Sequence, residues 1–469
     1  MLWSLHSGRQ AMTDLHIPSR QARRDAGKAL RKACARASHA EAGPGLDDRD
    51  PVALIEASNV DRLPNLLPIR HERMTESAFA FFRGTASIQA HDLTRTPSSG
   101  IRVQACGDCH LQNFGSFATP ERSFVFDIND FDETLPAPWE WDLKRLATSF
   151  VLAARWRSLG RDAAAETAIQ VVDAYRQAQA RYADMRTMEI WYDHLSFDTV
   201  RGELADDADS ARRLDAMVDK VRHQTSEQIF HKLTTPVNGM PRIVDQPPLL
   251  YHGAGDEQET RALAAPFLQA YRASLPSDRQ CLFDRWTLVD AAHKVVGIGS
   301  VGTRCLIALL MADAEDPLFL QVKEARASVL EGLAGPSPWT NNGERVVTGQ
   351  RLMQAASDIF LGWARGNGRD FYVRQMHDMK MSIDIARMNA RLLKLYADLC
   401  GRCLARAHAK AGDPAAIAGY LGNSDAMCDA VGRYAVRYAD QVERDYAQFL
   451  RAVRSGRLPI PQPDEAVVR

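Results

Sequence analysis

Two polar residues of the segment 106–113, CGDCHLQN, have a spacing that suits phosphoryl transfer. Asp108 and Asn113 lie five positions apart. A short irregular loop of this length lets one carboxylate face the hydroxyl of an acceptor while an amide oxygen, one loop width away, binds Mg²⁺. The carboxylate can then take the proton that the hydroxyl loses. The spacing therefore predicts a loop of this kind over 106–113.

A second group of acids follows an expected hairpin. The runs NFGSF and SFVFDI alternate large apolar residues on either side of the turn ATPER, a pattern that predicts two antiparallel strands. Directly after them, NDFDE supplies Asp130 and Asp132, while Asp127 lies inside the second run. A second metal ligand should come from the end of such a hairpin. These three aspartates are therefore candidate metal ligands.

A glycine-rich stretch, GIGSVG, occurs much later, between two strand-like runs. Gly297, Gly299 and Gly302 form the pattern G-x-G-x-x-G, and Lys323 follows in LFLQVKEA. Glycines let backbone amides approach a triphosphate, and a lysine on a neighbouring strand can bind phosphate oxygens. A dinucleotide-binding turn would instead continue into a helix, for which TRCLIALLM could serve. The lysine strand and the upstream acids favour the phosphate-binding hairpin.

The acidic segment resembles a known enzyme pattern. GDCHLQN, NDFDE and WDLKRLA are similar, in that order, to the G-D-x-H-x-x-N, I-D-[FW]-[DE] and D-L-A series of aminoglycoside phosphotransferases and choline kinases. The resemblance implies that Asp108 is the catalytic base and that Asn113 and Asp130 bind metal. It also implies that Asp142, at the start of a helix, braces the catalytic loop.

A more extensive resemblance covers roughly residues 65–450. The segments FAFFRG, GDCHLQNFGSF, FDINDFDET, WDLKRLA, QVKEA, GQRLMQAASDIFLGW and ARAHAKAGD are similar to a bacterial family of domains of unknown function, numbered 2252. This resemblance implies a family and almost nothing about substrate. His110 stands where the phosphotransferases also carry histidine. The distance to Asp142 favours Asp130 over Asp127 as the main metal ligand.

The order of the segments is inverted relative to kinases, in which the glycine-rich hairpin and the lysine strand come before the catalytic loop. The stretch CGRCLARAHAKAGD, at 400–413, is also similar to the phosphotransferase helix that directly precedes that loop. We therefore predict an α+β, kinase-like, two-lobed fold that is circularly permuted. It should have a mostly helical large lobe and a small antiparallel-sheet lobe, with the helix at 400–412 packed against residues 105–113.

Changes in the sequence pattern, from helix-like to strand-like and back, divide the chain into four parts. We expect residues 1–50 to be a flexible tail, 51–283 to hold the catalytic loop and a helical lobe, and 284–380 to form the small sheet lobe with the nucleotide cradle. Residues 381–469 should add helices that complete the large lobe. The helices between 150 and 280 would form a lid, as in small-molecule kinases.

Composition and charge narrow the classes of partner. A net charge of −1 over 469 residues provides no overall field to attract nucleic acid or an anionic membrane. No apolar run reaches the roughly 18 to 20 residues that cross a bilayer. The N-terminal stretch also lacks the apolar core of a secretory signal. A cytoplasmic protein without a nucleic-acid or membrane partner is therefore expected.

Eight cysteines include two C-x-x-C pairs, CGDC at 106–109 and CGRC at 400–403. Four thiolates could together bind zinc, or the pairs could serve redox chemistry. The pairs lie almost 300 residues apart, and neither sits among the Gly/Lys-rich turns of a zinc ribbon. This favours small buried thiols in a reducing compartment.

These features predict an ATP- and Mg²⁺-dependent phosphotransferase that acts on an unknown, small-molecule acceptor. The alternatives are a nucleotide-binding pseudokinase, a nucleotidyl (AMP) transferase of the same fold, and a zinc or redox protein. Arg83 in FFRG and Arg374 in YVRQ could reach phosphate or stabilise the body. The acid that pairs with Lys323 stays open among three glutamates: Glu344, Glu324 and Glu331.

Overall fold

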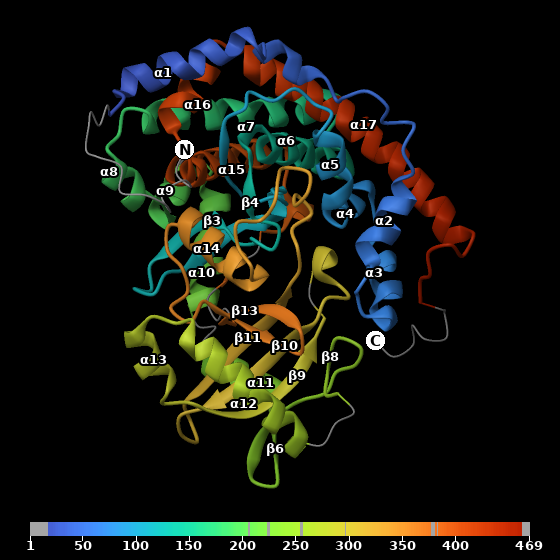
Figure 1. Cartoon of the computed structure of the whole chain (residues 1–469), viewed down its shortest axis with the longest axis vertical. Coiled ribbons are helices and arrows are strands. Elements are labelled where there is room, and N and C mark those ends of the chain that lie inside the picture. The colour runs from blue at the N-terminus through green and yellow to red at the C-terminus, as the bar shows by residue number, and fades with distance from the viewer. Residues whose placement is uncertain are drawn as a thin grey trace.

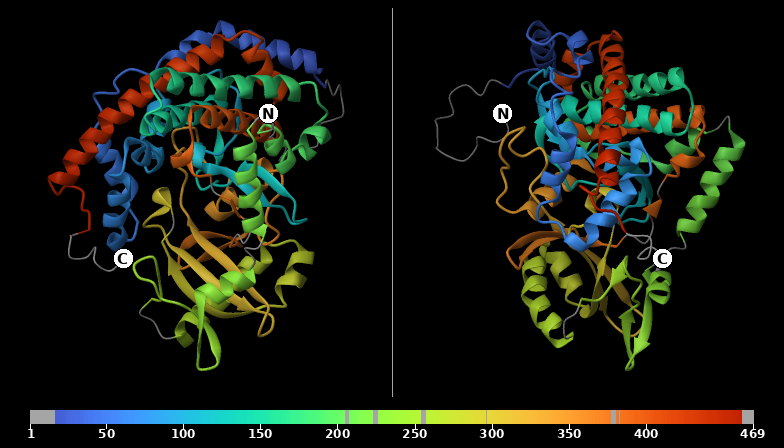
Figure 2. Two further views of the ribbon diagram at one scale, coloured as in Figure 1. Left: turned by 180° about the vertical axis from the view of Figure 1, so that it is seen from behind. Right: turned by 90° about the vertical axis from the view of Figure 1, so that its right-hand side faces the viewer.

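The computed structural model describes residues 17–204, 207–222, 226–253, 257–295, 297–376, 380–381 and 383–461. Within these ranges the chain combines helices with antiparallel sheet, which agrees with the α+β class. Helices gather at one end of the molecule and the largest sheet lies at the other (Figure 1). Figure 2 shows the same division from behind and from the side. No helix in the described ranges is both long and apolar enough to span a bilayer.

The helical part is organised around α6, which is buried along almost its whole length because it carries large apolar residues on most of its surface. Helices α7, α15 and α17 pack around α6, and all four contribute to one apolar core. The helices of this part are α2 (Pro51–Asn59), α3 (Leu67–Met74), α4 (Ala78–Arg83), α5 (Ala86–Leu93), α6 (Trp139–Trp156), α7 (Arg161–Tyr182), α8 (Thr187–Tyr192), α9 (Phe197–Gly202), α10 (Ala208–Arg222), α15 (Ala390–Ala411), α16 (Pro414–Leu421) and α17 (Ala426–Arg454).

Residues 17–50 do not form the flexible tail that the sequence suggested. Helix α1 (Arg20–Ala29) lies along α16 (Figure 1), and the short turns η1 (Leu30–Lys32) and η2 (Arg36–Ala40) follow it. The two helices approach through glycines, since a Cβ on Gly27 would come within 2.0 Å of the Ala416 carbonyl oxygen. Helix α1 therefore docks through small residues, without the large apolar stripe by which a packed helix is usually recognised.

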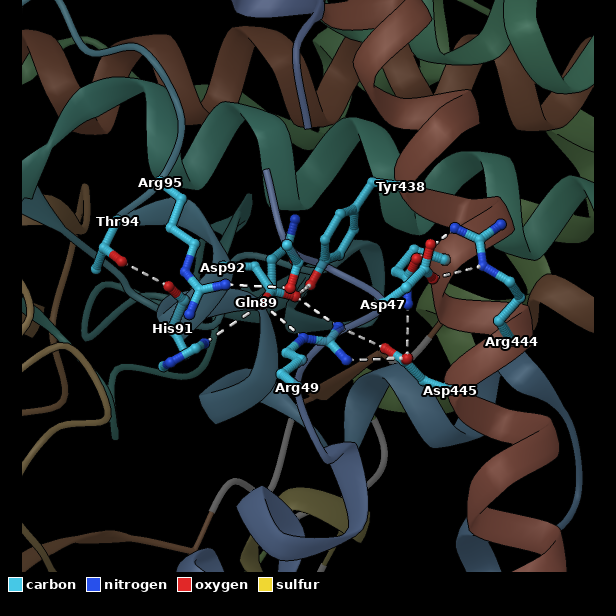
Figure 3. A network of polar contacts seen from close by, with 12 residues as sticks. Asp47, Arg49, Gln89, His91, Asp92, Thr94, Arg95, Tyr438, Arg444 and Asp445 are labelled. Carbon is cyan, nitrogen blue, oxygen red and sulfur yellow. Dashed lines mark hydrogen bonds and ion pairs between the residues drawn. The ribbon is translucent and has the colours of Figure 1, made fainter. Parts of the chain in front are cut away.

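A buried ionic network ties this N-terminal segment to two helices (Figure 3). The guanidinium of Arg49 binds both carboxylate oxygens of Asp92 on α5, each at 2.6 Å, and also binds Asp445 on α17, at 2.6 and 3.0 Å. Tyr438 donates a further hydrogen bond to Asp92, at 2.7 Å. Because all three charged side chains are at most 5% exposed, each depends on the others for its solvation.

Replacing Arg49 by methionine is expected to lower the free energy of unfolding by about 3–5 kcal/mol, because two buried carboxylates lose their shared cation. Arg155 is a matched control, since its partners Asp440 and Glu443 are about half exposed. Arg155→Met should cost under about 1 kcal/mol. Urea unfolding followed by circular dichroism measures both values, and equal losses would contradict a supporting role for the network.

The largest sheet has the strand order β12-β13-β11-β10-β9-β8, and every neighbouring pair is antiparallel. The central strand β11 is buried at all nine positions, which explains its nearly continuous apolar run. Its side chains alternate between faces, so Phe319, Gln321 and Lys323 share one of them. The strands are β8 (Leu250–Tyr251), β9 (Thr287–Lys294), β10 (Cys305–Met311), β11 (Pro317–Ala325), β12 (Gly362–Gly366) and β13 (Arg369–Gln375), with helix α14 (Asn342–Met353) between β11 and β12.

The sheet part begins well before residue 284, where the boundary was expected. One apolar cluster joins Leu320 of β11 to residues that precede the sheet. They are Tyr271 of α12 (Glu257–Ala273), Leu275 of the turn after α12, and Phe283 of α13 (Ser277–Phe283). On the other face, α11 (Ser226–Leu233) and β7 (Met240–Ile243), which pairs with β6 (Thr234–Val237), contribute to a second cluster. The expectation of one lid over 150–280 is therefore wrong, because α6 and α7 form the helical core while α11–α13 cover the sheet.

Two smaller sheets lie between these parts. The predicted hairpin is confirmed as β2 (Phe114–Ala118) and β3 (Phe124–Ile128), which pair in antiparallel register. This sheet has the order β14-β2-β3-β5, with β5 (Leu195–Ser196) and β14 (Lys380–Met381) at its edges. Strands β1 (Arg102–Ala105) and β4 (Leu135–Pro138) form a separate pair. The loop 106–113 and the acidic turn 129–134 thus lie at the ends of short paired strands, which fix their positions.

Candidate functional site

The start of the loop 106–113 is held by Asp142, in the first turn of α6. Its Oδ2 accepts a hydrogen bond from the backbone N–H of Cys106 at 2.7 Å, and its Oδ1 accepts one from that of Gly107 at 3.0 Å. His408 of α15 contacts Oδ2 through Nε2 at 3.2 Å. Asp142 is 1% exposed, so these partners replace its hydration. Its geometry is that of the bracing residue suggested by the resemblance.

Helix α15 lies against this loop, as the inverted segment order predicted. Tyr396 donates a hydrogen bond to the backbone oxygen of Leu111 at 2.6 Å, and His408 meets Asp142 beside the start of the loop. His408 is fully buried and also contacts the hydroxyl of Tyr175 at 2.8 Å. Two segments almost 300 residues apart in the chain therefore pack against each other behind the cavity.

A second residue of α6, Arg145, fixes Asp108. Its Nε donates to Asp108 Oδ1 at 2.6 Å, while its other nitrogens bind Gln89 and the backbone oxygen of Phe82. Asp142 and Arg145 are three residues apart on one face of the helix, and Ser149, one turn further, accepts the backbone N–H of Leu111. Arg145 was not among the residues singled out in the sequence, although its spacing from Asp142 in WDLKRLA was visible.

Asp108 lies at the edge of a cavity, with its side chain 19% exposed. Burial raises the pKa of its carboxyl group, while Arg145 and Arg83 act in the opposite direction. His110 Nε2 is 3.9 Å from Asp108 Oδ2, too far for a hydrogen bond, and its buried Nδ1 has no partner among the described residues. Burial lowers the pKa of His110 well below its usual value, so its ring is neutral at physiological pH.

The glycine-rich stretch connects β9 and β10, which pair in antiparallel register. The prediction of a hairpin is therefore confirmed, and the alternative of a helix after the glycines is wrong, because Cys305–Met311 is strand β10. Gly302 has a φ of 89°, a conformation that favours glycine. Its backbone oxygen accepts the N–H of Leu63 at 2.7 Å, and Arg62 donates to the backbone oxygen of Val301 at 2.6 Å.

The two halves of the chain meet directly at Lys323. Its ammonium group binds Asp132 Oδ2 at 2.8 Å. Tyr372, which lies opposite Lys323 on the neighbouring strand β13, donates to Asp132 Oδ1 at 2.6 Å. Ser300 of the glycine turn donates to Asp132 Oδ2 at 3.2 Å. Burial acts to raise the pKa of Asp132, but Lys323 outweighs it and holds the pKa at about 2. The pair is therefore ionised at physiological pH.

None of the glutamates considered as partners of Lys323 pairs with it, so that prediction is wrong. Glu324 lies next in the strand and faces the other way, toward Arg304 and Arg369. Glu344 lies in the first turn of α14, and Glu331 accepts the backbone N–H of Ser337. Helix α14 instead directs the buried Arg345 at the acidic turn, where it binds the backbone oxygens of Asp132 and Thr134, and Arg345 also binds that of Arg326 after β11.

Asp130 and Asn113 can offer oxygen ligands to a cation. Asn113 donates from Nδ2 to the backbone oxygen of Asp108 at 2.7 Å, which leaves its amide oxygen as the end available to a ligand. Asp130 accepts the backbone N–H of Asp132 at 3.1 Å, and burial raises its pKa, as does the nearby charge of Asp132. Mg²⁺ is bound by one or two carboxylates together with phosphate and water oxygens. The donor set fits Mg²⁺ bound together with phosphates.

A cavity of about 530 Å³ is lined by both sets of predicted residues. Most of them face it: Asp108, His110, Asn113, Asp130, Asp132, Gly297, Gly299 and Lys323, together with Arg83 and Arg374. Gly302 stands behind the turn and Asp142 stands behind the loop, so both shape the cavity without lining it. A Cβ on Gly299 would lie 3.9 Å from Asp108 Oδ2, which shows how closely the two loops approach.

Asp127 lies outside this cavity, contrary to its prediction as a rival metal ligand. It is fully buried and forms an ion pair with Arg406 of α15 at 2.6 Å. It also accepts the backbone N–H of Ala355 at 2.7 Å and the thiol of Cys403 at 3.3 Å. Its place inside β3 turns the side chain into the interior, so it joins the hairpin to α15.

The cysteine pairs do not gather around one ion in the described part of the chain. Cys106 and Cys109 lie together with Asp142, whose oxygens already accept backbone hydrogen bonds, while Cys403 faces Asp127. All four thiols are buried, and burial raises the pKa of each. Such thiols are poor nucleophiles and metal ligands at neutral pH. Their arrangement matches the interpretation as small buried side chains.

Glu133 also lines the cavity, although the sequence had not marked it. Its Oε2 accepts the backbone N–H of Val329 at 2.6 Å, and burial raises its pKa to about 7. The folded state thus binds a proton between about pH 4.5 and 7 that the unfolded chain releases. Within this interval, stability falls as the pH rises.

Replacing Glu133 by glutamine should remove that pH dependence, because glutamine keeps an oxygen for Val329 and does not ionise. Relative to the wild type, Glu133→Gln should gain up to about 3 kcal/mol between pH 5 and 8. Urea unfolding at several pH values measures the difference. A constant difference over this interval would show that the carboxyl group titrates normally.

One protein-family model matches residues 62–452, and its description is "uncharacterized protein conserved in bacteria (DUF2252)". The chain belongs to the DUF2252 family. The matched range includes the loop 106–113, the acidic turn, the glycine-rich hairpin and α15, so all the site residues predicted from the sequence lie within it. Neither a curated protein nor a solved structure matches the chain.

Proposed function

We propose that this DUF2252 protein is an ATP- and Mg²⁺-dependent phosphotransferase with a kinase-like, circularly permuted arrangement, and that its acceptor is a small molecule. The observation that carries the proposal is the 2.8 Å ion pair between Lys323 and Asp132. It joins the strand after the glycine-rich hairpin to the turn after the catalytic-type loop. Both elements face one cavity, although about 190 residues separate them.

The order of elements in the sheet part supports the kinase-like arrangement. A glycine-rich hairpin (β9–β10) is followed by a strand with a lysine (β11) and then by a helix (α14), which is the order in protein kinases. One difference concerns the helix. In kinases it carries a glutamate for the lysine, whereas here α14 carries Arg345, and the acid comes from Asp132.

Each group around the cavity has a role in this proposal. The glycine turn and Lys323 bind the phosphates, Arg145 orients Asp108, and Asp108 faces the acceptor. Mg²⁺, held by Asp130 and Asn113, would offset the negative charge of the phosphates. The acceptor oxygen forms a bond to the γ-phosphorus while the bond from that phosphorus to the β–γ bridging oxygen breaks. ADP leaves, and Asp108 takes the hydroxyl proton.

The test uses purified protein, Mg²⁺, a small-molecule extract of bacterial cells, and ATP labelled in either the α- or the γ-phosphate. The γ-label should move to a compound of the extract while the α-label stays in nucleotide. Movement of the α-label would indicate AMP transfer. Nucleotide binding without movement of either label would indicate a pseudokinase, and the absence of nucleotide binding would contradict the proposal.

A further inference from the structure

Three arginines of the cavity wall gather around one residue, Ser58, near the end of α2. Arg62 donates from Nε to the Ser58 backbone oxygen at 3.0 Å, and Arg326 donates from Nη1 to the same oxygen at 3.3 Å. Arg70 donates from Nη2 to the Ser58 hydroxyl at 3.4 Å. All four residues line the cavity. The cations come from α3, the loop before it and the end of β11, so folding places like charges side by side.

These three arginines have no carboxylate partner among the described residues, as their contacts are with oxygens of backbone and neutral side chains. The acids nearest to Arg62 are engaged elsewhere: Glu133 by Val329, Glu324 by Arg304 and Arg369, and Asp132 by Lys323. Burial lowers the pKa of Arg62 to about 10, and the charge of Arg326 adds to the effect. Glu133, Glu324 and Asp132 act on Arg62 only from a distance, so positive charge is concentrated here without a direct ion pair, which is costly in a buried site.

Arg83 extends this cationic surface to Asp108. Arg70 donates to the backbone oxygen of Gly84 at 2.7 Å, and Gly84 directly follows Arg83. Arg83 lines the cavity, its buried Nε has no hydrogen-bond partner among the described residues, and Asp108 is the charge that acts on it most strongly. By contrast, Arg145 on the other side of Asp108 has its nitrogens occupied. Arg83 is therefore placed to bind a group that enters beside the catalytic carboxylate.

Resting on the proposed function, we infer that the acceptor is an anion, a small molecule that carries a phosphate or carboxylate group as well as the hydroxyl that is phosphorylated. Its anionic group lies among Arg62, Arg70, Arg83 and Arg326, and its hydroxyl faces Asp108. Capping of α2 explains the bonds of Arg62 and Arg326 to the backbone oxygens of Ser58 and Val60. It does not explain the buried Nε atoms of Arg70 and Arg83, which lack a partner in the part of the chain that the structure describes.

The nucleotide phosphates are assigned to the part of the cavity where Ser300 of the glycine-rich turn and Lys323 both bind Asp132. There Lys323 of β11 and Arg374 of β13 project toward Asp130 and Asp132. The two carboxylates offset the positive charges, and they mark the side of the cavity that is proposed to bind the metal. The arginines around Ser58 instead belong mainly to the helical segment that carries Arg83. This separation gives the two anions, nucleotide and acceptor, distinct sets of cations.

The first experiment separates the bacterial extract by anion exchange and supplies each fraction to the protein with γ-labelled ATP and Mg²⁺. Label should enter compounds of the retained, anionic fraction and none of the flow-through. Arg83→Gln and Arg326→Gln should lower kcat/KM for the purified labelled compound about 100-fold, with the affinity for ATP changed less than about threefold. Arg369→Gln is the matched control, because Arg369 pairs with Glu324 and does not line the cavity.

Transfer to neutral or cationic compounds would overturn the inference, and so would a loss of ATP affinity in Arg83→Gln that equals its loss in kcat/KM. A second measurement does not depend on turnover. Calorimetric titration with inorganic phosphate should give a Kd at least about tenfold lower for the wild type than for Arg83→Gln. If no fraction is phosphorylated, the proposed function fails, and this titration decides on the anion site alone. Equal binding, or no binding, would overturn the inference.

Discussion

Replacing Asp108 by asparagine is expected to lower the rate of phosphoryl transfer about 10³-fold, because a positioned general base contributes roughly 10² to 10⁴. The affinity for ATP and Mg²⁺ should change less than about threefold, since the proposed function places Asp108 beside the acceptor. Asparagine keeps an oxygen that can accept the hydrogen bond from Arg145. The loop should therefore stay in place, and the loss should appear in the chemical step.

The measurement is the transfer of label from γ-labelled ATP, together with the Kd of an ATP analogue by calorimetry. Asp440→Asn is the matched control, as Asp440 of α17 is half exposed, pairs with Arg155 of α6 and does not line the cavity. It should keep full activity. If the Asp108→Asn variant keeps activity within tenfold of the wild type, another group must take the proton.

Replacing Lys323 by methionine is expected to weaken the binding of ATP at least about tenfold and to lower transfer about 10²- to 10³-fold, since a buried cation no longer meets the phosphates. The change also leaves the carboxylate of Asp132 without its cation, and the loss of a buried partner costs about 3–5 kcal/mol of stability. Stability and binding must therefore be measured separately.

The double variant Lys323→Met/Asp132→Asn separates these two effects. It removes both charges, so its free energy of unfolding should recover toward the wild-type value, while its affinity for ATP stays low. Lys394→Met, which removes an exposed lysine paired with Glu166, is the control for both measurements. Wild-type affinity in the double variant would show that Lys323 does not bind the nucleotide.

The features that could be predicted from the sequence are local ones. The hairpin β2–β3 follows from alternating apolar residues around a turn, and the strand after the glycines follows from the apolar run on either side of an acidic turn. Asp142 could be placed because the resemblance to phosphotransferases implies a bracing role for the aspartate at this helix start. In each case the residues that decide the structure lie within about 40 positions of one another.

The errors concern contacts between distant segments. Asp127 and Asp130 are three residues apart, and only the packing of β3 against α15 shows that Asp127 pairs with Arg406 and is unavailable to a metal. The partner of Lys323 comes from the other half of the chain, so nearby glutamates were misleading. Helix α1 was missed because it docks through glycine, which leaves no apolar periodicity to detect.

The central claim is that two segments far apart in the chain enclose one nucleotide and its metal. A crystal structure with a non-hydrolysable ATP analogue and Mn²⁺, whose anomalous signal locates the ion, tests it most directly. We predict phosphates between the turn 297–302 and Lys323, with Mn²⁺ bound by Asp130 and Asn113. A nucleotide bound outside this cavity, or Mn²⁺ at ligands that exclude both residues, would contradict the account.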